Sequence, residues 1–301
     1  MNTFQNRTAV ITGAASGFGL EISRLLAARG ANIVMADVQQ DALDKAAAEV
    51  EALGAKVLTF RLDVARAAEV EAMGAVTLAR FGAPHFVFNN AGVSSGGLSW
   101  EHSLKDWEWV VGVNLMGVAH GIRVFTPMML EAARKDPAYE GHITNTASMA
   151  GLVNMPNSIA YNATKSAVVA MSETLYQDLS LVTDQIHCSV LCPYFVPTGI
   201  IRSERNRPAD LVEDKPLTQS QQVAKALGEK AVSSGKVSAA QVAQFVLDAA
   251  AEKRFYVYSH PHALAVVQTR MEDIVQGRNP SDPFKERPQL GENLRRALRG
   301  G

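Results

Sequence analysis

Hydrophobic positions form short continuous runs along the chain, and longer stretches with a helical pattern of apolar residues separate these runs. The runs have the length of strands, and the intervening stretches have the length of helices. Strands are expected at 8–12, 32–36, 56–62, 85–88, 142–146, 186–191 and 255–258. Helices are expected at 17–29, 40–53, 65–81, 104–133, 158–182, 238–252 and 264–275. Strands that are short of polar residues and alternate with helices predict a parallel sheet covered on both faces.

The order of these elements predicts the fold class. Right-handed crossovers between parallel strands make a doubly wound α/β sheet, the Rossmann fold, the economical topology. The alternation stops after Pro193, and residues 198–236 are polar and rich in turns, with a helix-prone part at 209–235. Because this segment follows the end of a strand, we expect it to form a helical lid over a site. We expect one domain over residues 1–301, with a core at about 5–260 and a C-terminal extension at about 261–301 that ends in a Pro/Arg-rich tail.

The composition argues against several kinds of partner. Lysine plus arginine (29) nearly balances aspartate plus glutamate (30), so no net field attracts nucleic acid or an anionic membrane. The basic stretch near the C-terminus is interpreted as a solvated helix face, and it contains Arg287, Arg295, Arg296 and Arg299. No signal-peptide core precedes the first strand, and no uninterrupted apolar run is long enough to span a bilayer. A soluble, cytoplasmic protein is therefore expected.

Cysteine and histidine positions predict neither a disulfide nor a metal site. Cys188 and Cys192 lie in one apolar strand, about 13 Å apart, which is too far for a disulfide. They are interpreted as core residues in a reducing compartment. His260 and His262 are close in sequence, but no Cys, Asp or further His stands at a metal-ligand spacing from them. No metal is expected.

A glycine-rich turn, Thr12 to Gly19, joins the first strand to the first helix. Gly13 permits a tight turn, and Gly17 and Gly19 are expected to let the backbone approach a pyrophosphate at the helix N-terminus. The turn does not match a P-loop, because Leu20 stands where that motif needs lysine. Glycines after a strand are weak evidence alone, but their place in the first strand–helix unit favours a dinucleotide site.

Asp37 ends the second strand, where a ribose-binding acid is expected. Its carboxylate can accept hydrogen bonds from both adenosine ribose hydroxyls, and its charge would repel the 2′-phosphate of NADP. Neither Val38 nor Gln39 offers a cation to offset that charge. We therefore expect NAD rather than NADP, although a strand-end Asp can also cap the following helix.

At Asn89-Asn-Ala-Gly92 and Tyr161-x-x-x-Lys165 the sequence resembles the short-chain dehydrogenase/reductase family, in its compact single-domain branch. The resemblance runs from about Thr8 to Tyr258, and one motif departs from it, because Tyr194 replaces a glycine near the nicotinamide end. It implies a catalytic tetrad of Asn114, Ser148, Tyr161 and Lys165, in which Asn114 holds a water that links Lys165 to solvent. With the glycine turn, it implies that the cofactor contacts Gly13, Ser16, Gly17, Phe18, Gly19, Asp37, Asp63, Val64, Asn90, Ala91, Gly92, Tyr161, Lys165, Pro193, Val196 and Thr198.

Tyr161 and Lys165 can also be assigned from their chemistry. Residues four apart on a helix share one face. A lysine cation about 4 Å from a phenol is worth up to about 4 kcal/mol at an effective dielectric near 20, or about three pKa units. Tyr161 could then exchange the substrate's hydroxyl proton while a nicotinamide exchanges the hydride, and Ser148 could hold the substrate oxygen. Each residue alone has an ordinary structural explanation, but their order on one α/β chain favours catalysis.

The apolar residues after two strands predict the substrate class. The expected substrate contacts are Ser148, Met149, Val153, Met155, Tyr161, Tyr194 and Phe195, none of them charged. They favour a hydrophobic, ring-bearing secondary alcohol or ketone. Three alternatives are an NADP-dependent carbonyl or 3-oxoacyl reductase, a nucleotide-sugar epimerase or dehydratase, and a non-catalytic nucleotide sensor. The spacing of the glycine turn and the lack of a second substrate domain argue against the epimerase, and the intact tetrad argues against the sensor.

The resemblance further implies a homo-oligomer, a dimer or a homotetramer. Trp107 and Val168 lie on the long helices that would form its interface. Trp100, Trp107 and Trp109 lack a basic surround, so core or subunit interface is a better interpretation for them than a base-stacking platform.

Overall fold

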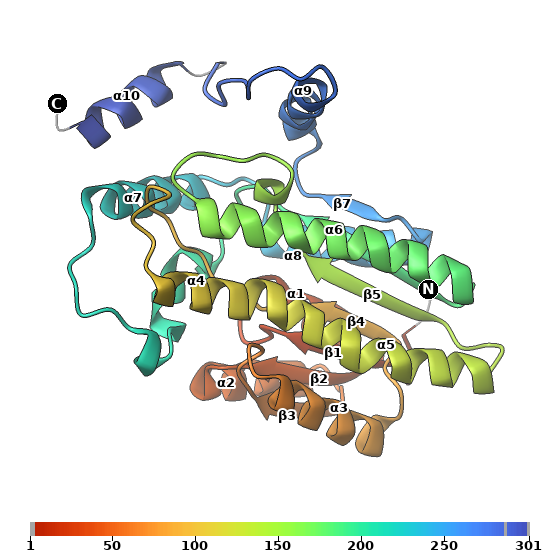
Figure 1. The fold of residues 1–301 in the computed structure, drawn as a ribbon. Coiled ribbons are helices and arrows are strands. Elements are labelled where there is room, and N and C mark those ends of the chain that lie inside the picture. The colour runs from red at the N-terminus through yellow and green to blue at the C-terminus, as the bar shows by residue number, and fades with distance from the viewer. Residues whose placement is uncertain (1–3, 286–287, 300–301) are drawn as a thin grey trace.

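The computed structural model describes residues 4–285 and 288–299, and it contains one parallel sheet of seven strands in the order β3-β2-β1-β4-β5-β6-β7 (Figure 1). Every neighbouring pair of these strands is parallel. Their bounds are β1 Thr8–Thr12, β2 Asn32–Asp37, β3 Val57–Arg61, β4 Phe86–Asn89, β5 Gly141–Thr146, β6 Ile186–Cys192 and β7 Tyr256–Tyr258. The order reverses between β1 and β4, as in a doubly wound Rossmann sheet. The predicted fold class is confirmed.

Alternate residues of each strand enter different cores, because successive side chains point to opposite faces of a sheet. In β1, Ile11 packs into the core beneath three helices on one face, α1 Gly17–Ala27, α2 Gln40–Glu51 and α8 Ala239–Glu252. Val10, its neighbour, packs into the core on the other face, beneath α3 Ala67–Phe81, α5 Gly117–Lys135 and α6 Ile159–Val182. Strands buried on both faces explain why the sequence shows continuous apolar runs rather than alternation.

Both cysteines are free and buried, and both lie in β6, as the sequence predicts. The tryptophans have different environments, because Trp109 is buried in a small core cluster whereas Trp100 is exposed. Val168 is fully buried inside the protein, against Val190 and other core residues. The prediction that Val168 lies at a subunit interface is therefore wrong, because α6 turns this side chain inward.

The long helix expected at 104–133 contains a turn of wider helix. It comprises α4 Leu104–Val111, the π-helical turn η1 Gly112–Met116, and α5, which ends at Lys135. Inserted π turns often occur at functional sites, and this one carries Asn114. By length and composition the continuous helix 104–135 could cross a membrane, and half of its most apolar window is buried inside the protein. The core helix of a soluble protein passes the same test, so this is weak evidence of a span.

We use the name lid for residues 198–236. The lid begins with two 3-10 helices, η3 Gly199–Asn206 and η4 Ala209–Leu211, and ends with α7 Gln219–Ser233. Within the helix-prone part predicted at 209–235, the α-helix is shorter than expected, because Thr218 starts α7 with a capping box and residues 212–217 form a loop after η4.

The C-terminal extension contains two helices. The short turn η5 Pro261–Ala263 leads into α9 Leu264–Val275, as predicted. The predicted tail instead forms α10 Pro288–Arg299, which lies beside α7, and the Gln219 side chain donates a hydrogen bond to the carbonyl of Ala297 (2.6 Å) (Figure 1). Arg295, Arg296 and Arg299 lie on this helix, whereas Arg287 lies outside the described residues.

Candidate active site

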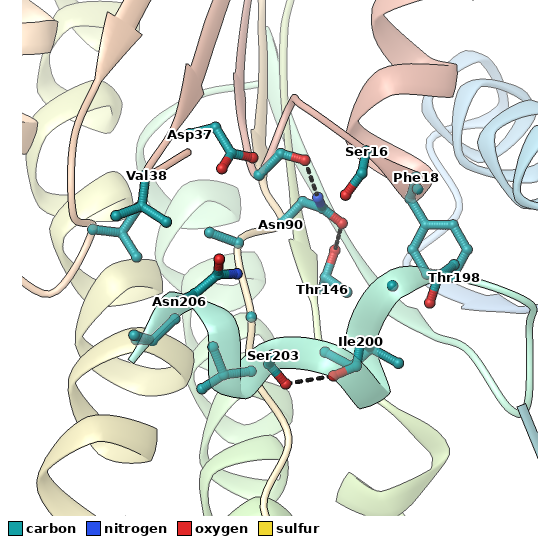
Figure 2. Close-up of a pocket in the computed structure, with 18 of the residues that line it drawn as sticks. Ser16, Phe18, Asp37, Val38, Asn90, Thr146, Thr198, Ile200, Ser203 and Asn206 are labelled. Atoms are coloured by element: carbon teal, nitrogen blue, oxygen red, sulfur yellow. Dashed lines mark hydrogen bonds between the residues drawn. The ribbon is translucent and has the colours of Figure 1, made fainter. Parts of the chain in front are cut away.

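A long cavity lies at the carboxyl ends of the strands, and the lid forms its opposite wall (Figure 2). In a doubly wound sheet, ligands bind at this edge, where the strand order reverses. Most of the predicted site residues share the cavity: Gly13, Ser16, Gly17, Phe18, Asp37, Asp63, Val64, Asn90, Ala91, Gly92, Ser148, Tyr161, Lys165, Pro193, Tyr194, Val196 and Thr198 all line it. These residues come from seven separate stretches of the sequence, and the fold brings them together around one cavity.

The glycine turn has the shape that a diphosphate needs. Gly13 and Gly17 both have positive φ, 65° and 54°, which side chains other than glycine rarely adopt. Ser16 is the N-cap residue of α1, and its side chain caps no backbone N–H there, so the first N–H groups of α1 are left available to an anion. A Cβ on Gly13 would touch the backbone of Ala91 at 3.0 Å. The turn therefore fits a dinucleotide phosphate, on the evidence of its own backbone.

Gly19 has a different role from the one predicted. A Cβ at this position would collide with the carbonyl of Gly13, so α1 packs directly on the turn. Among the described residues that line the cavity, Gly19 does not appear. Gly19 thus supports close packing of helix and strand rather than the approach of a ligand.

Asp37 lies at the end of β2 and lines the cavity. Its carboxylate accepts hydrogen bonds from the backbone N–H groups of Ala15 (3.1 Å) and Gln39 (3.0 Å). These bonds hold the carboxylate in place between the glycine turn and the start of α2. The Asp37 side chain thus caps the backbone after β2 and lines the cavity beside Val38 (Figure 2).

Asn90 ties three strands together at the floor of the cavity. Its side chain donates to the carbonyl of Thr12 (3.0 Å) and accepts from the hydroxyl of Thr146 (3.3 Å) (Figure 2). The Asn89 side chain is buried and donates to Asn145 (2.8 Å), and a Cβ on Gly121 would collide with it. Asn89 therefore packs α5 on the sheet, while Asn90 to Gly92 form the cavity floor.

Asn114 lies behind the cavity wall and not on it. Its amide donates to the carbonyl of Val93 (2.9 Å) and accepts from the N–H of the same residue (2.8 Å). A Cβ on Gly92 would lie 3.4 Å from Asn114 Oδ1 and 3.5 Å from Lys165 Nζ, so these two side chains converge beneath Gly92. The π turn places the Asn114 amide where it fixes the backbone of the cavity floor.

Tyr161, Lys165 and Ser148 meet at one end of the cavity. Lys165 Nζ lies 5.7 Å from the centre of the Tyr161 ring and donates to the carbonyl of Thr146 (2.8 Å). Burial lowers the pKa of Lys165 to about 8. Burial also raises the pKa of Tyr161, and a hydrogen bond with Ser148 opposes that rise. Burial and the hydrogen bond with Ser148 thus change the pKa of Tyr161 in opposite directions, and burial has the larger effect.

The predicted substrate contacts divide into two groups. Ser148, Tyr161 and Tyr194 line the cavity. Met149, Val153, Met155 and Phe195 are not among the described residues that line it. Met149 is buried in the core with Leu152 and Val168, because the 3-10 turn η2 Met149–Gly151 directs it inward.

Several residues that line the cavity were not predicted as contacts. They are mostly apolar, and they include Val93, Trp109, Val113, Ile200, Ser203 and Val232. Trp109 lies on α4 and Val113 lies on η1. Their spacing in the sequence indicates an apolar helix face, but it does not indicate that this face lines a cavity. Ile200, Ser203 and Val232 belong to the lid, whose position over the strand edge depends on tertiary contacts.

The lid is attached to the rest of the protein by side chains. Ser203 Oγ accepts a hydrogen bond from the N–H of Ser94 (2.9 Å). Arg207 pairs with Asp106 of α4 at 2.7 Å, and its guanidinium lies over the ring of Trp109, 4.2 Å from the ring centre. Both charged side chains are almost buried, with exposed fractions of 7% and 12%. We call Arg207, Asp106 and Trp109 together the Arg207 latch.

Fold and site together define a dinucleotide-dependent oxidoreductase, because a glycine-rich phosphate turn and the side chains of Tyr161, Lys165 and Ser148 line one cavity. The family model for short chain dehydrogenases matches residues 7–209. The chain belongs to the short-chain dehydrogenase/reductase family and is an NAD(P)-dependent oxidoreductase that acts on alcohols or the corresponding carbonyl compounds.

Three known proteins place the chain within this family. A short-chain dehydrogenase/reductase from Burkholderia phymatum, solved in complex with NAD, is 48% identical, with a TM-score of 0.91 over 94% of this chain and 99% of that one. The CLA biosynthesis dehydrogenase/reductase of Lactiplantibacillus plantarum is 32% identical over 93% of this chain and 97% of its own length. Cyclohexanol dehydrogenase from an Acinetobacter strain is 31% identical over 72% of this chain and 82% of its own.

Proposed function

We propose that the protein interconverts a hydrophobic, ring-bearing secondary alcohol and its ketone with NAD(H), and that Tyr161 is the acid and base of the reaction. The observation that carries the proposal is that Tyr161, Ser148 and Lys165 line the same cavity as the phosphate-binding turn.

The oxidised nicotinamide, when bound, accepts a hydride from the alcohol carbon and supplies a positive charge near the phenol. Tyr161 takes the hydroxyl proton of the alcohol during oxidation and returns a proton to the carbonyl oxygen during reduction. Ser148 lines the same cavity as Tyr161, and its hydroxyl holds that oxygen. Lys165 is held at the floor by Thr146, where its cation stabilises the phenolate.

The choice of NAD over NADP rests on Asp37. Its carboxylate is fixed by two backbone N–H groups at the edge of the cavity, so it stays where a 2′-phosphate would come. The B. phymatum structure, whose bound cofactor is NAD, supports the same choice. One observation favours the alternative of an NADP-dependent reductase, because Arg205 of the lid donates to Gln39 (3.1 Å) and so brings a cation near Asp37.

The substrate class rests on the walls around Tyr161. Val93, Trp109, Tyr194 and Ile200 line this part of the cavity, and all present apolar or aromatic surface. Arg207, which could otherwise attract an anionic substrate, is already paired with Asp106 and Glu204. The similarity to a protein named cyclohexanol dehydrogenase agrees with a ring-bearing alcohol.

The test is a spectrophotometric screen of NAD⁺ and NADP⁺ reduction with cyclic, aryl and linear secondary alcohols, together with NADH oxidation by ketones and by small anionic keto acids. We expect kcat/KM to be highest for cyclic or aryl compounds with NAD(H). An Asp37→Ala variant should narrow the gap between the two cofactors. A clear NADP preference in the wild type would contradict the role given to Asp37, and a preference for keto acids would contradict the substrate class.

We also propose that residues 1–301 act as one domain, that the protein is a cytoplasmic homo-oligomer, either a dimer or a homotetramer, and that its interface lies on the outer surface of α5 and α6. Tyr176, Leu181 and Val182 of α6 are exposed apolar residues of the kind that such an interface covers. Light scattering after size-exclusion chromatography measures the mass directly, and a mass of about 32 kDa in solution would rule out the oligomer.

A further inference from the structure

The first helix of the lid, η3, forms part of one wall of the cavity (Figure 2). It starts at Thr198, whose side chain lies against Gly17 of the phosphate turn, and a Cβ built on Gly17 would be 3.5 Å from Thr198 Cγ2. It ends at Asn206, on the same side of the cavity as Asp37 and Val38 (Figure 2). The lid therefore covers the half of the cavity assigned to the adenosine diphosphate, besides the half that contains Tyr161.

Asn206 presents an unused hydrogen-bonding group to this half. Its side chain points from the end of η3 into the cavity (Figure 2), and its Oδ1 is buried without a hydrogen-bond partner among the described residues. Buried polar atoms are usually paired in folded proteins, so an unpaired one on a cavity wall leaves a hydrogen bond open to a ligand. A carboxamide offers a donor and an acceptor side by side, which matches the edge of adenine or the hydroxyls of its ribose.

Arg205 presents an unneutralised cation to the same half. It lines the cavity, and its guanidinium donates to neutral acceptors only, the side chain of Gln39 (3.1 Å) and the carbonyls of Gly199 (3.1 Å) and Arg202. No carboxylate of residues 4–285 or 288–299 lies within ion-pair distance of it. Arg207 differs sharply, because two carboxylates pair with it. Arg205 thus leaves a full positive charge between Gly199, next to the phosphate turn, and Gln39, which follows Asp37 and Val38.

We propose that Arg205 and Asn206 form a cofactor clamp on the lid, in which Arg205 binds the diphosphate and Asn206 binds the adenosine. The inference rests on the cofactor part of the proposed function and adds two binding residues that no sequence motif indicates. Its consequence is an order of binding, since a dinucleotide that contacts η3 fixes the lid over Tyr161 before the substrate arrives. The Arg207 latch holds the lid to α4 independently of the cofactor.

The test uses Arg205→Gln, which keeps hydrogen-bonding capacity without charge, and Asn206→Leu, which keeps size without polarity. Arg202→Gln is the matched control, because Arg202 is an exposed arginine of the same helix that does not line the cavity. Calorimetry measures the binding of ADP-ribose, AMP and nicotinamide mononucleotide, and fluorescence measures the binding of NADH. Limited proteolysis at residues 207–218 measures whether ADP-ribose fixes the lid.

We expect Arg205→Gln to weaken NADH and ADP-ribose roughly tenfold, the effect of one lost charge-assisted contact. Asn206→Leu should weaken ADP-ribose and AMP several-fold and leave nicotinamide mononucleotide unchanged. ADP-ribose should protect the lid of the wild type and of Arg202→Gln from proteolysis, but not the lid of the two clamp variants.

Two results would overturn the clamp. One is ADP-ribose affinity within twofold of wild type in both clamp variants, and the other is an equal loss in Arg202→Gln, which would indicate general attraction between charges instead. Thermal unfolding without ligand identifies a variant that has lost its fold. If the folded wild type binds neither NADH nor ADP-ribose, the cofactor assignment itself is wrong, and that outcome differs from loss of the clamp alone.

Discussion

The two walls of the cavity are held in place by different interactions. The strand-edge wall carries the glycine turn, Asp37, Asn90 and the catalytic residues, and it continues from a sheet whose strands are buried on both faces. The lid wall is attached by a few side-chain contacts, such as Ser94 to Ser203, the Arg207 latch, and Glu101 to Thr218 (2.6 Å). One wall therefore takes its geometry from backbone pairing, and the other takes it from side chains that can separate.

This difference assigns separate tasks to the two walls. Chemistry needs groups fixed to within a fraction of an ångström. The strand end before Ser148 and the helix α6, which carries Tyr161 and Lys165 and packs on the sheet, supply that precision. Substrate and cofactor must enter and leave, so the wall that covers them needs contacts that break at modest cost. We therefore expect changes in the strand-edge wall to alter turnover, and changes in the lid to alter affinity and selectivity.

Tyr161→Phe gives the largest expected effect and tests the strand-edge wall. The variant keeps the ring and loses the proton carrier, so turnover should fall by about a thousandfold, within the range for a lost general acid–base. Folding and NADH affinity should stay at wild-type values. The measurement is kcat in both directions, beside NADH binding by fluorescence. A variant with more than a tenth of wild-type kcat would show that another residue carries the proton.

His142 tests the sheet that supports this wall. Its ring is buried in β5, hydrogen-bonds with Ser189 (2.8 Å) and stacks on Phe86. Burial lowers its pKa from 6.5 to about 3, so the unfolded chain binds a proton below pH 6.5 that the folded chain refuses down to about pH 3. The free energy of unfolding should therefore decrease as the pH is lowered from 6.5 towards 3. Linkage gives a decrease on the order of 3 kcal/mol at pH 4 relative to pH 7.

The measurement is urea unfolding of the wild type and of His142→Gln at several pH values. Carboxylates also titrate in this window, so the informative quantity is the difference between the two proteins. Glutamine can still bond with Ser189 but does not titrate, so the variant should lose less stability on acidification. Parallel curves for the two proteins would mean that His142 is not the group responsible.

Most of the strand-edge wall was predictable from the sequence. The seven strands were predicted correctly, and the glycine turn, Asp37, Ser148, Tyr161 and Lys165 all line the cavity, because each follows a strand or shares a helix face. The role of Gly19 was not predictable, since it depends on a contact with the Gly13 carbonyl that only the packed turn creates. The raised pKa of Tyr161 was missed because its burial could not be read from spacing.

The lid was far less predictable. Its position after a strand indicated that it would cover a site, but 3-10 helices of three to eight residues have no periodic signature to find. Arg205 and Arg207 look alike in sequence, and only the structure shows one unneutralised and the other paired with Asp106. Met149 was placed in the pocket wrongly for the same reason, because the direction of a side chain after a strand is set by the local turn.

Arg207→Met tests the lid wall, with an effect intermediate in size. The change removes the ion pair with Asp106 and the contact with Trp109 while keeping apolar bulk. Breaking a buried pair costs about 3–5 kcal/mol when no relief is possible, and here separation of the lid from α4 lets water reach Asp106. We expect KM for the substrate to rise about tenfold, with kcat changed less than threefold.

The control is Arg202→Met, on the helix η3 that directly precedes Arg207, and exposed to solvent. It should leave KM unchanged, and proteolysis between 207 and 218 should accelerate only in Arg207→Met. A fall in kcat with unchanged KM would remove the distinction between the two walls, because the latch would then act on the chemistry.

Tyr194→Gly has the smallest expected effect, because Tyr194 lies where the two walls meet. Its backbone N–H donates to Ser259 (2.9 Å), just after β7, so its backbone belongs to the sheet side. Its ring lies against Phe195 and His260, is 40% exposed, and lines the cavity, so its side chain belongs to the substrate end. Removing the ring should enlarge the pocket without moving Tyr161, because the contacts that hold the catalytic residues at the strand edge do not include the Tyr194 ring.

We expect bulkier cyclic or aryl ketones to gain several-fold in kcat/KM over small ones in Tyr194→Gly, with NADH affinity within twofold of wild type. Tyr194→Phe, which keeps the ring, should retain the wild-type ranking. If Tyr194→Gly leaves the ranking of substrates unchanged, the ring does not bound the pocket, and the substrate end must lie closer to Trp109 and Ile200.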